Sequence, residues 1–341
     1  MDTSSRFSLG LLGTGRIGTM HAGILANHAG LGRLVVADAD AERAQSTAAR
    51  FGCEAAEVAQ VLDPANPLAL DGLIIATSTV THADLLVAAA RTGLPTFCEK
   101  PLALDLAEAL RAQSALEAAG LPHHIGFHRR FDHGYRRARD LLRAGELGEL
   151  HRFHALTCDQ FPPSPEFVAG SGGIFRDCNV HDFDILRWLT GREVVEVYAT
   201  GIARGHDVYA AHQDFSEAVA VLTLDDGTIG TVQASRYNGQ GYEVRLDLMG
   251  TAGSANVGLD AKVPLRSVEA GTGFPTEAPW TDFIERFLPC YEREIDDFLT
   301  GPMLGSAGAC TAADAVAALR IADACTRSAH ENRPVRLDEI G

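Results

Sequence analysis

The chain has 341 residues, and its 29 basic and 45 acidic side chains leave it at −16 with histidine counted as neutral. This length predicts two domains, and the content of 46% hydrophobic and 22% charged residues is that of a folded protein rather than a disordered one. Its acidity argues against nucleic acid as a partner, and no run of about 18 apolar residues predicts a membrane span.

The seven cysteines are scattered along the chain, and no two of them form a C-x-x-C pair. An odd number of separated cysteines predicts free thiols in a reducing compartment and gives no structural zinc site. The first residues also lack the basic, apolar and cleavage segments of a secretion signal. These features predict a cytoplasmic protein.

Residues 7–100 alternate short apolar runs with helix-like segments. This rhythm predicts β-α-β units that build a doubly wound parallel sheet. The expected strands are 7–13, 34–37, 72–76 and 95–100, and the expected helices are 16–28, 41–51 and 81–91.

A G-x-G-x-x-G motif separates the first expected strand from its helix. Its residues are Gly13, Thr14, Gly15, Arg16, Ile17 and Gly18. The glycines alone could serve only a tight turn. Their place between a strand and a helix favours a dinucleotide site, in which the pyrophosphate of the cofactor lies at the helix N-terminus.

Asp38, at the end of the second expected strand, indicates which dinucleotide binds. A carboxylate at this position accepts hydrogen bonds from the ribose hydroxyls of NAD and repels the 2′-phosphate of NADP. Ala39 offers that phosphate no donor, and Arg43 lies in the following helix, where Asp40 or solvent is its expected partner. The sequence therefore predicts NAD as the cofactor.

Lys100 follows the last apolar run of this half, within Glu99-Lys100-Pro101. Active sites of open parallel sheets form beyond the carboxyl ends of the strands, so Lys100 is expected to project towards a bound nicotinamide. Pro101 restricts the backbone of Lys100 and so fixes the direction of its side chain. The alternative is a surface ion pair.

The second chemical cluster lies in residues 171–191, which predict a largely buried helix that ends at Gly191. Helical spacing places Asp177, His181 and Asp184 on one stripe. His181 is then either a core histidine satisfied by the aspartates or a general base that they orient. Metal ligation ranks third, since no further His or Cys cluster supports it, and we predict no metal site.

Five segments together carry a family resemblance. In chain order they are Gly13–Gly18, Thr81-His82, Glu99-Lys100-Pro101, Gly126–Asp132 and Gly172–Asp184. Each is common alone, but their order and spacing are specific. The chain resembles the Gfo/Idh/MocA family of NAD(P)-dependent sugar and cyclitol dehydrogenases, and within it the inositol 2-dehydrogenases most.

The resemblance implies an α/β protein with an N-terminal Rossmann domain, residues 1–126, and a C-terminal α/β domain, residues 127–341, built on a large open, mostly antiparallel sheet. It also implies a catalytic triad of Lys100, Asp177 and His181.

One departure from the family pattern concerns the substrate. Many inositol dehydrogenases of this type have Ser-Arg-Asp-Pro where this chain has Thr157-Cys158-Asp159-Gln160, which leaves the polyol open.

The second half shows the long alternating runs of an antiparallel sheet. Expected strands are 150–158, 193–202, 217–227, 228–237 and 242–257, with a short one at 334–337 and helices at 280–299 and 311–331. Such a sheet leaves one broad face to be covered. A second subunit is the usual cover in the family, so we expect a homo-oligomer, either a dimer or a tetramer.

The remaining site residues fall into two sets. Thr77, Ser78, His82 and Glu99 are assigned to the cofactor site with the glycine loop and Asp38. Arg129, Asp159 and Tyr237 are candidates for binding the substrate, although a surface salt bridge for Arg129 and a loop-surface position for the other two are equally compatible with the sequence.

The leading interpretation is an enzyme that oxidises a secondary hydroxyl of a polyol to a ketone and reduces NAD. His181 would accept the proton, Lys100 would stabilise the developing alkoxide and Asp177 would bind a substrate hydroxyl. Two alternatives remain: an NADPH-dependent keto-sugar reductase, which Asp38 disfavours, and a non-catalytic sugar sensor gated by a dinucleotide. The sequence does not indicate which hydroxyl reacts.

Overall fold

The computed structural model describes residues 6–273 and 275–341 and divides the chain into two compact units. The first unit ends its main part at Phe127 and includes Tyr291–Val316. The second comprises His128–Cys290 and Ala317–Gly341. None of the helices in the described residues combines the length and the apolar character that crossing a membrane requires.

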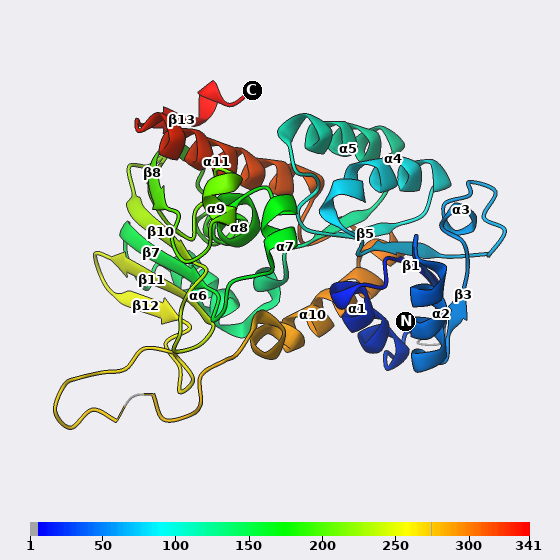
Figure 1. Ribbon diagram of the computed structural model, residues 1–341, viewed down its shortest axis with the longest axis horizontal. Coiled ribbons are helices and arrows are strands. Elements are labelled where there is room, and N and C mark those ends of the chain that lie inside the picture. The colour runs from blue at the N-terminus through cyan, green and yellow to red at the C-terminus, as the bar shows by residue number, and fades with distance from the viewer. Residues whose placement is uncertain (1–5, 274) are drawn as a thin grey trace. The chain divides into compact units, whose positions relative to one another are not determined.

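The first unit is a six-stranded sheet in which every pair of neighbouring strands is parallel, in the order β3-β2-β1-β4-β5-β6. Its strands are β1 Phe7–Leu12, β2 Leu31–Ala37, β3 Glu54–Ala55, β4 Gly72–Ile75, β5 Thr96–Glu99 and β6 His123–Gly126. Its helices are α1 Arg16–Ala26, α2 Ala41–Phe51, α3 Val58–Val61, α4 His82–Thr92 and α5 Leu106–Ala119. Figure 1 shows α4 and α5 on one side of this sheet and α1 and α2 on the other. The strand order reverses between β1 and β4, where doubly wound sheets bind dinucleotides.

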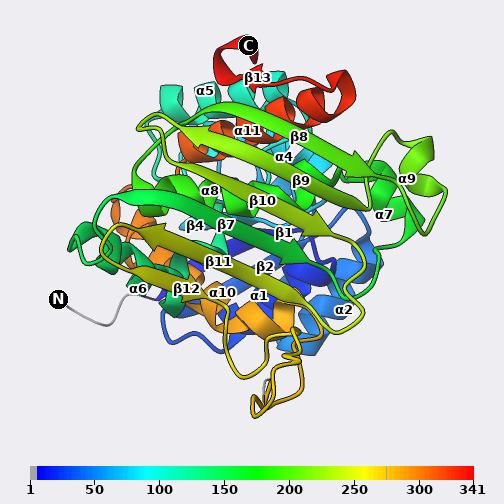
Figure 2. The same cartoon turned by 90° about the vertical axis from the view of Figure 1, so that its left-hand side faces the viewer.

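The second unit is a seven-stranded mixed sheet with the order β12-β11-β7-β10-β9-β8-β13. Its strands are β7 Leu150–Cys158, β8 Val194–Ile202, β9 Glu217–Leu224, β10 Ile229–Ser235, β11 Glu243–Gly250, β12 Ser254–Val257 and β13 Val335–Arg336. Within the described part of the chain, only β7 and β10 of this sheet pair in parallel, so the expected mostly antiparallel sheet is confirmed. Figure 2 shows these strands from the side that no helix covers.

Helices pack on one face of this sheet. They are α6 His133–Arg143, α8 Val180–Thr190 and most of α11 Ala312–Glu331, while the short helices α7 Pro165–Gly170 and α9 Val208–Ala211 lie near one end (Figures 1 and 2). The predicted single helix over 171–191 is wrong at its start. Residues Phe175–Asn179 form a π-helical turn, and the α-helix begins only at Val180. The predicted stop at Gly191 is confirmed, since this glycine ends α8 in the left-handed conformation.

The structure also differs from the expected division at residue 127. The later part of helix α10, Phe283–Thr300, belongs with the first unit rather than with the substrate domain. Ile295, Phe298 and Leu299 are buried in the same apolar core as Leu9 and Phe97 of the parallel sheet. The burial of these apolar side chains explains why a segment so late in the chain returns to the first unit.

Candidate active site

The glycine loop between β1 and α1 has the backbone that its motif predicts. Gly13 has a φ of +92°, and a Cβ built there would lie 2.6 Å from the carbonyl oxygen of Ala76. A Cβ at Gly18 would lie 1.9 Å from the carbonyl oxygen of Gly13, so α1 can approach the strand only without a side chain at this position. A Cβ at Gly15 meets nothing within 4 Å. The loop therefore leaves room at Gly15 for a ligand to approach its backbone, as a pyrophosphate requires.

Asp38 follows β2, and its carboxylate is held in one orientation. The backbone N–H and the hydroxyl of Thr14 donate to Oδ2 over 2.7 and 2.9 Å, and the N–H of Asp40 donates to Oδ1 over 2.9 Å. Burial alone would raise the pKa of Asp38, but the bonds from Asp40 and Thr14 lower it overall, so the group is ionised at neutral pH. Arg43 bonds to Asp40 over 3.2 Å, as expected, and lies 3.9 Å from Asp38.

His82 is buried at the start of α4 and contacts two segments of the first unit. Its Nδ1 lies 2.7 Å from the carbonyl oxygen of Pro101, and its Nε2 lies 3.2 Å from that of Thr77. Burial lowers the pKa of His82, so the ring is neutral at neutral pH. The ring thus links the loop after β4, which contains Thr77 and Ser78, to the residue that follows Lys100.

Glu99, the last residue of β5, is buried with His21 of α1. Its Oε1 lies 2.6 Å from the Nε2 of His21, and the two residues are 7% and 0% exposed. Lys100, the next residue, is half-buried. The carboxylate of Glu99 therefore connects the strand that leads to Lys100 with the helix that begins at the glycine loop.

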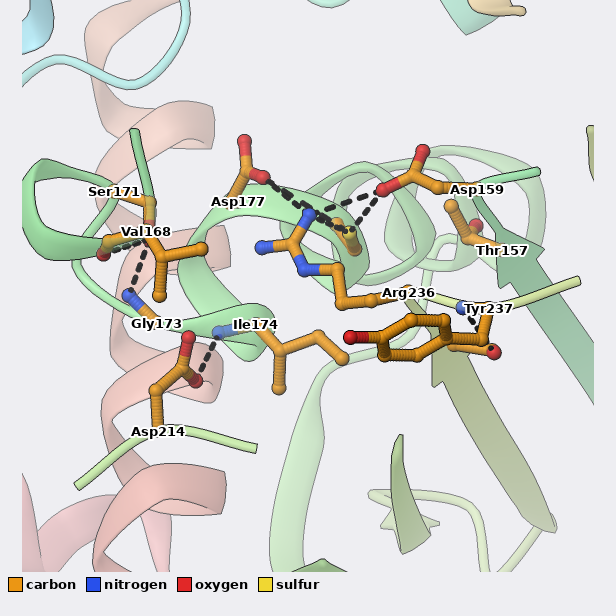
Figure 3. Close-up of polar contacts among 12 residues, drawn as sticks. Thr157, Asp159, Val168, Ser171, Gly173, Ile174, Asp177, Asp214, Arg236 and Tyr237 are labelled. Atoms are coloured by element: carbon orange, nitrogen blue, oxygen red, sulfur yellow. Dashed lines mark hydrogen bonds and ion pairs between the residues drawn. The ribbon is translucent and has the colours of Figure 1, made fainter. Parts of the chain in front are cut away.

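The second unit brings Asp177 and Asp159 together around one buried guanidinium, as Figure 3 shows. The Nη1 of Arg236 lies 2.8 Å from Oδ2 of Asp177, 3.1 Å from Oδ2 of Asp159 and 3.0 Å from Sγ of Cys178. Asp159 follows β7 and Arg236 follows β10, and these neighbouring strands are parallel with Cys158 opposite Ser235. Their carboxyl ends therefore meet at one edge of the sheet, where the π-helical turn supplies Asp177.

His181 lies in the first turn of α8 and is 8% exposed. Its ring packs edge-on against that of His128, with the ring centroids 4.9 Å apart. Asp184, expected on the same stripe, instead forms a buried bidentate ion pair with Arg130, which donates from Nε over 2.9 Å and from Nη2 over 2.5 Å. Asp184 thus neutralises a buried arginine, and the orientation of His181 by the aspartates stays a prediction.

The three expected substrate residues occupy different environments. Arg129 is 2% exposed and donates to Asp182 over 2.5 Å and to Thr157 over 2.9 Å, so its salt bridge is in the interior rather than at the surface. Asp159 belongs to the carboxylate pair. Tyr237 is 37% exposed, with its hydroxyl against Gly205. These contacts favour a supporting role for Arg129 and leave Asp159 and Tyr237 as candidates for binding.

Neither Arg236 nor His128 was predicted from the sequence as a residue of the site. Arg236 directly precedes Tyr237 after an apolar strand, and His128 lies within a motif that carried the family resemblance. Only the order of the strands shows that Arg236 adjoins Asp159. Only the packing of α8 shows that His128 adjoins His181.

The strand order and the glycine loop define the first unit as a Rossmann domain, a fold that binds dinucleotides. Comparison with known families agrees: residues 7–127 match the oxidoreductase family with an NAD-binding Rossmann fold, and residues 135–256 match the GFO/IDH/MocA C-terminal domain. The chain belongs to the Gfo/Idh/MocA family of oxidoreductases. The family, the fold class, the enzyme class and the cofactor predicted from the sequence are thereby confirmed.

The similar proteins include several inositol dehydrogenases. The chain is 34% identical to scyllo-inositol 2-dehydrogenase (NAD(+)) of Bacillus subtilis, covering 96% of this chain and 95% of the relative. It is 36% identical to myo-inositol dehydrogenase Hyg17 of Streptomyces leeuwenhoekii, covering 94% and 97%. Among solved structures, scyllo-inositol dehydrogenase of Lactobacillus casei with bound NAD(H) and scyllo-inositol matches with a TM-score of 0.87 at 25% identity, covering 98% of this chain and 100% of that one.

Alanine substitutions at two glycines of the loop separate folding from cofactor binding. Gly18→Ala should lower the free energy of unfolding by roughly 3 kcal/mol, because its Cβ would overlap the Gly13 carbonyl oxygen. Gly15→Ala should change that free energy by less than about 0.5 kcal/mol, since its Cβ meets no protein atom, yet it should weaken NAD binding about tenfold or more. Urea unfolding and NAD titration by fluorescence measure the two effects. Native NAD affinity in Gly15→Ala would contradict the assignment of this loop.

Proposed function

We propose that this protein oxidises a secondary hydroxyl of an inositol, or of a closely similar cyclitol or sugar, to a ketone and reduces NAD. The observation that carries the proposal is the carboxylate pair of Asp159 and Asp177 beside the helix that bears His181, in a chain that also contains an NAD-binding unit. Carboxylates suit a polyol, because they accept hydrogen bonds from hydroxyl groups. The similarity to inositol dehydrogenases over nearly the whole chain supports the same substrate class.

In this mechanism the first unit contributes Lys100 and the second contributes Asp177 and His181. His181 accepts the proton of the reacting hydroxyl as a general base. Lys100 donates a hydrogen bond to the oxygen on which negative charge develops, and Asp177 accepts one from a substrate hydroxyl and so orients the ring. The glycine loop and Asp38 would hold NAD, which would supply the acceptor for the hydride that leaves the carbon bearing the reacting hydroxyl.

The proposal is tested by mixing the protein with NAD and a panel of polyols and recording absorbance at 340 nm. The panel includes myo-inositol, scyllo-inositol, hexoses and anhydro-sugars, and the same mixtures with NADP serve as a control. An increase in absorbance with an inositol and NAD supports the proposal. No NADH from any polyol, combined with polyol-induced thermal stabilisation, would point to a sensor. Faster oxidation of NADPH by a keto-sugar would point to a reductase.

The helix-free face of the second unit supports a homo-oligomer. Tyr198, Ile202, Val221 and Ile229 are 41%, 45%, 43% and 53% exposed there. Tyr198 pairs with Val221 across β8 and β9, so the group includes directly adjacent side chains. Apolar groups of this kind on a sheet mark a surface that another protein covers, and closed symmetric assembly of identical chains is its commonest cover.

Replacing Val221 with Glu should dissociate this assembly, since an unpaired carboxylate would be buried in the interface. Light scattering should give a multiple of 36.3 kDa for the wild type and that mass for Val221→Glu, while Val221→Thr should keep the wild-type mass. A monomeric wild type at micromolar concentration would contradict the proposal.

We also propose that the protein works in the cytoplasm, where its seven free cysteines stay reduced.

A further inference from the structure

Arg236 is a buried cation whose contacts differ from those of Arg130, another buried arginine of the second unit. Arg130 uses two different nitrogens for the two oxygens of one carboxylate, that of Asp184. Such a bidentate pair is strong and fixes one contact in the fold. Arg236 instead uses a single nitrogen, Nη1, for the Oδ2 atoms of two carboxylates, Asp159 and Asp177.

The other donors of Arg236 reinforce this difference. The side chain is 1% exposed, and its Nε and Nη2 have no hydrogen-bond partner among the described residues. Buried donors without partners destabilise a fold, so packing alone gives no reason for an arginine here. Burial lowers the pKa of Arg236, but Cys178, Asp177 and Asp159 raise it, and the net direction is well above its ordinary value. Arg236 is therefore a permanent cation between two acidic groups.

Both Oδ2 atoms lie within hydrogen-bonding distance of the same nitrogen, so the two carboxylates are held close to each other. We infer that Arg236 is a positioning residue that holds Asp159 and Asp177 as an ionised pair of acceptors for two neighbouring hydroxyls of the substrate. This inference rests on the proposed polyol dehydrogenase activity and extends it. If the inference is right, the second unit recognises a vicinal diol of the substrate.

Other ionisable groups surround this cluster and must be considered in its pH dependence. Burial raises the pKa values of Cys158, Tyr209 and Tyr242, so these groups are neutral over the pH range of the kinetic measurements. Asp182 is paired with Arg129, which balances its charge. Further ionisable groups of this region, among the described residues, are His181 on α8, Asp214 before β9, Glu217 on β9 and Glu243 on β11, and burial raises the pKa of both glutamates.

Arg236→Gln removes the cation and keeps a polar side chain. Without the positive charge, the two carboxylates and His181 all bind protons more readily, so the acidic limb of the kcat/KM profile should move to higher pH by about one unit. The KM for the polyol should rise about tenfold or more, because the acceptors are no longer held, and kcat should fall less. Arg236→Lys retains the charge and should keep the acidic limb near that of the wild type, with partial recovery of KM.

Arg176→Gln is the matched control. Arg176 directly precedes Asp177, but its Nε donates to Asp323 over 2.7 Å, so this variant removes a nearby cation without touching the carboxylate pair. It should lower Tm and leave the acidic limb in place. Polyol-induced thermal stabilisation, recorded for each variant with NADH bound, measures substrate binding without turnover and should be lost in Arg236→Gln only.

The outcomes separate this inference from the proposed function. If none of the tested polyols allows the wild type to reduce NAD, the proposed function is contradicted. An active wild type with an Arg236→Gln variant that loses Tm, but keeps its KM and acidic limb, contradicts only the role of Arg236. If Arg236→Gln does not fold, Asp159→Asn replaces it. That change removes one of the two negative charges beside Arg236, so the acidic limb should move to lower pH, and an unmoved limb would overturn the inference.

Discussion

Replacing His181 with Ala should lower turnover by about 10²–10⁴-fold with saturating NAD and polyol, the range that a general base contributes. His181→Gln should be nearly as slow, because an amide can form a hydrogen bond but cannot accept the proton. Both variants should bind NAD with near-native affinity, since the glycine loop and Asp38 belong to the first unit. Stopped-flow or steady-state NADH formation measures turnover, and fluorescence titration measures NAD affinity.

The pH dependence of the wild type checks the same role. The rate should rise with pH as the imidazole loses its proton, and this limb should vanish in His181→Gln. His151→Gln is the matched control, because the side chain of His151 is 63% exposed and distant in sequence from the site. Near-native turnover in either His181 variant would make His181 a core histidine and Lys100 the better candidate for the base.

Changing Asp38 to Ser together with Ala39 to Arg should reverse the preference for NAD over NADP. The wild-type carboxylate is ionised and fixed by Thr14 and the N–H of Asp40, so it accepts from ribose hydroxyls and repels a 2′-phosphate. The double variant removes that repulsion and supplies an arginine that can bind the phosphate. Titration of both cofactors by fluorescence should show NAD binding weakened at least about tenfold and NADP binding strengthened.

Asp40→Asn is the control for this substitution. Asp40 lies two residues away and caps helix α2 through its side chain, and asparagine caps a helix as well as aspartate does. It therefore removes a neighbouring negative charge but keeps the local fold, and the preference for NAD should remain. Tighter binding of NADP than NAD by the wild type would show that Asp38 does not set the cofactor preference.

The sequence predicted much of the fold because hydrophobic periodicity is a local signal. The helix 41–51 and the strand 150–158 have the expected bounds. Helix α5, Leu106–Ala119, was not predicted, because its buried face consists mostly of alanines and gives a weak apolar stripe. The π-helical turn at Phe175–Asn179 contains no glycine or proline, so its residues do not signal it, whereas Gly172 and Gly173, with φ of +77° and +97°, mark the non-helical residues before it.

The site was predictable only in part, because its ion pairs join residues that are distant in sequence. Asp177 and His181 follow from residue type and spacing. The contact of Arg236 with Asp159 spans 77 residues and depends on β10 lying beside β7, which local patterns do not specify. The same holds for Asp184, whose buried partner Arg130 lies 54 residues earlier in the chain.

Transfer of deuterium from substrate to cofactor tests the proposed hydride transfer most directly. The protein is mixed with NAD and with myo-inositol or scyllo-inositol that carries deuterium at every ring carbon, so the result does not depend on which hydroxyl reacts. Proton NMR of the product should show deuterium at C4 of the reduced nicotinamide, together with one keto-inositol for each NADH. NADH without deuterium, or no NADH from either inositol, would contradict the account.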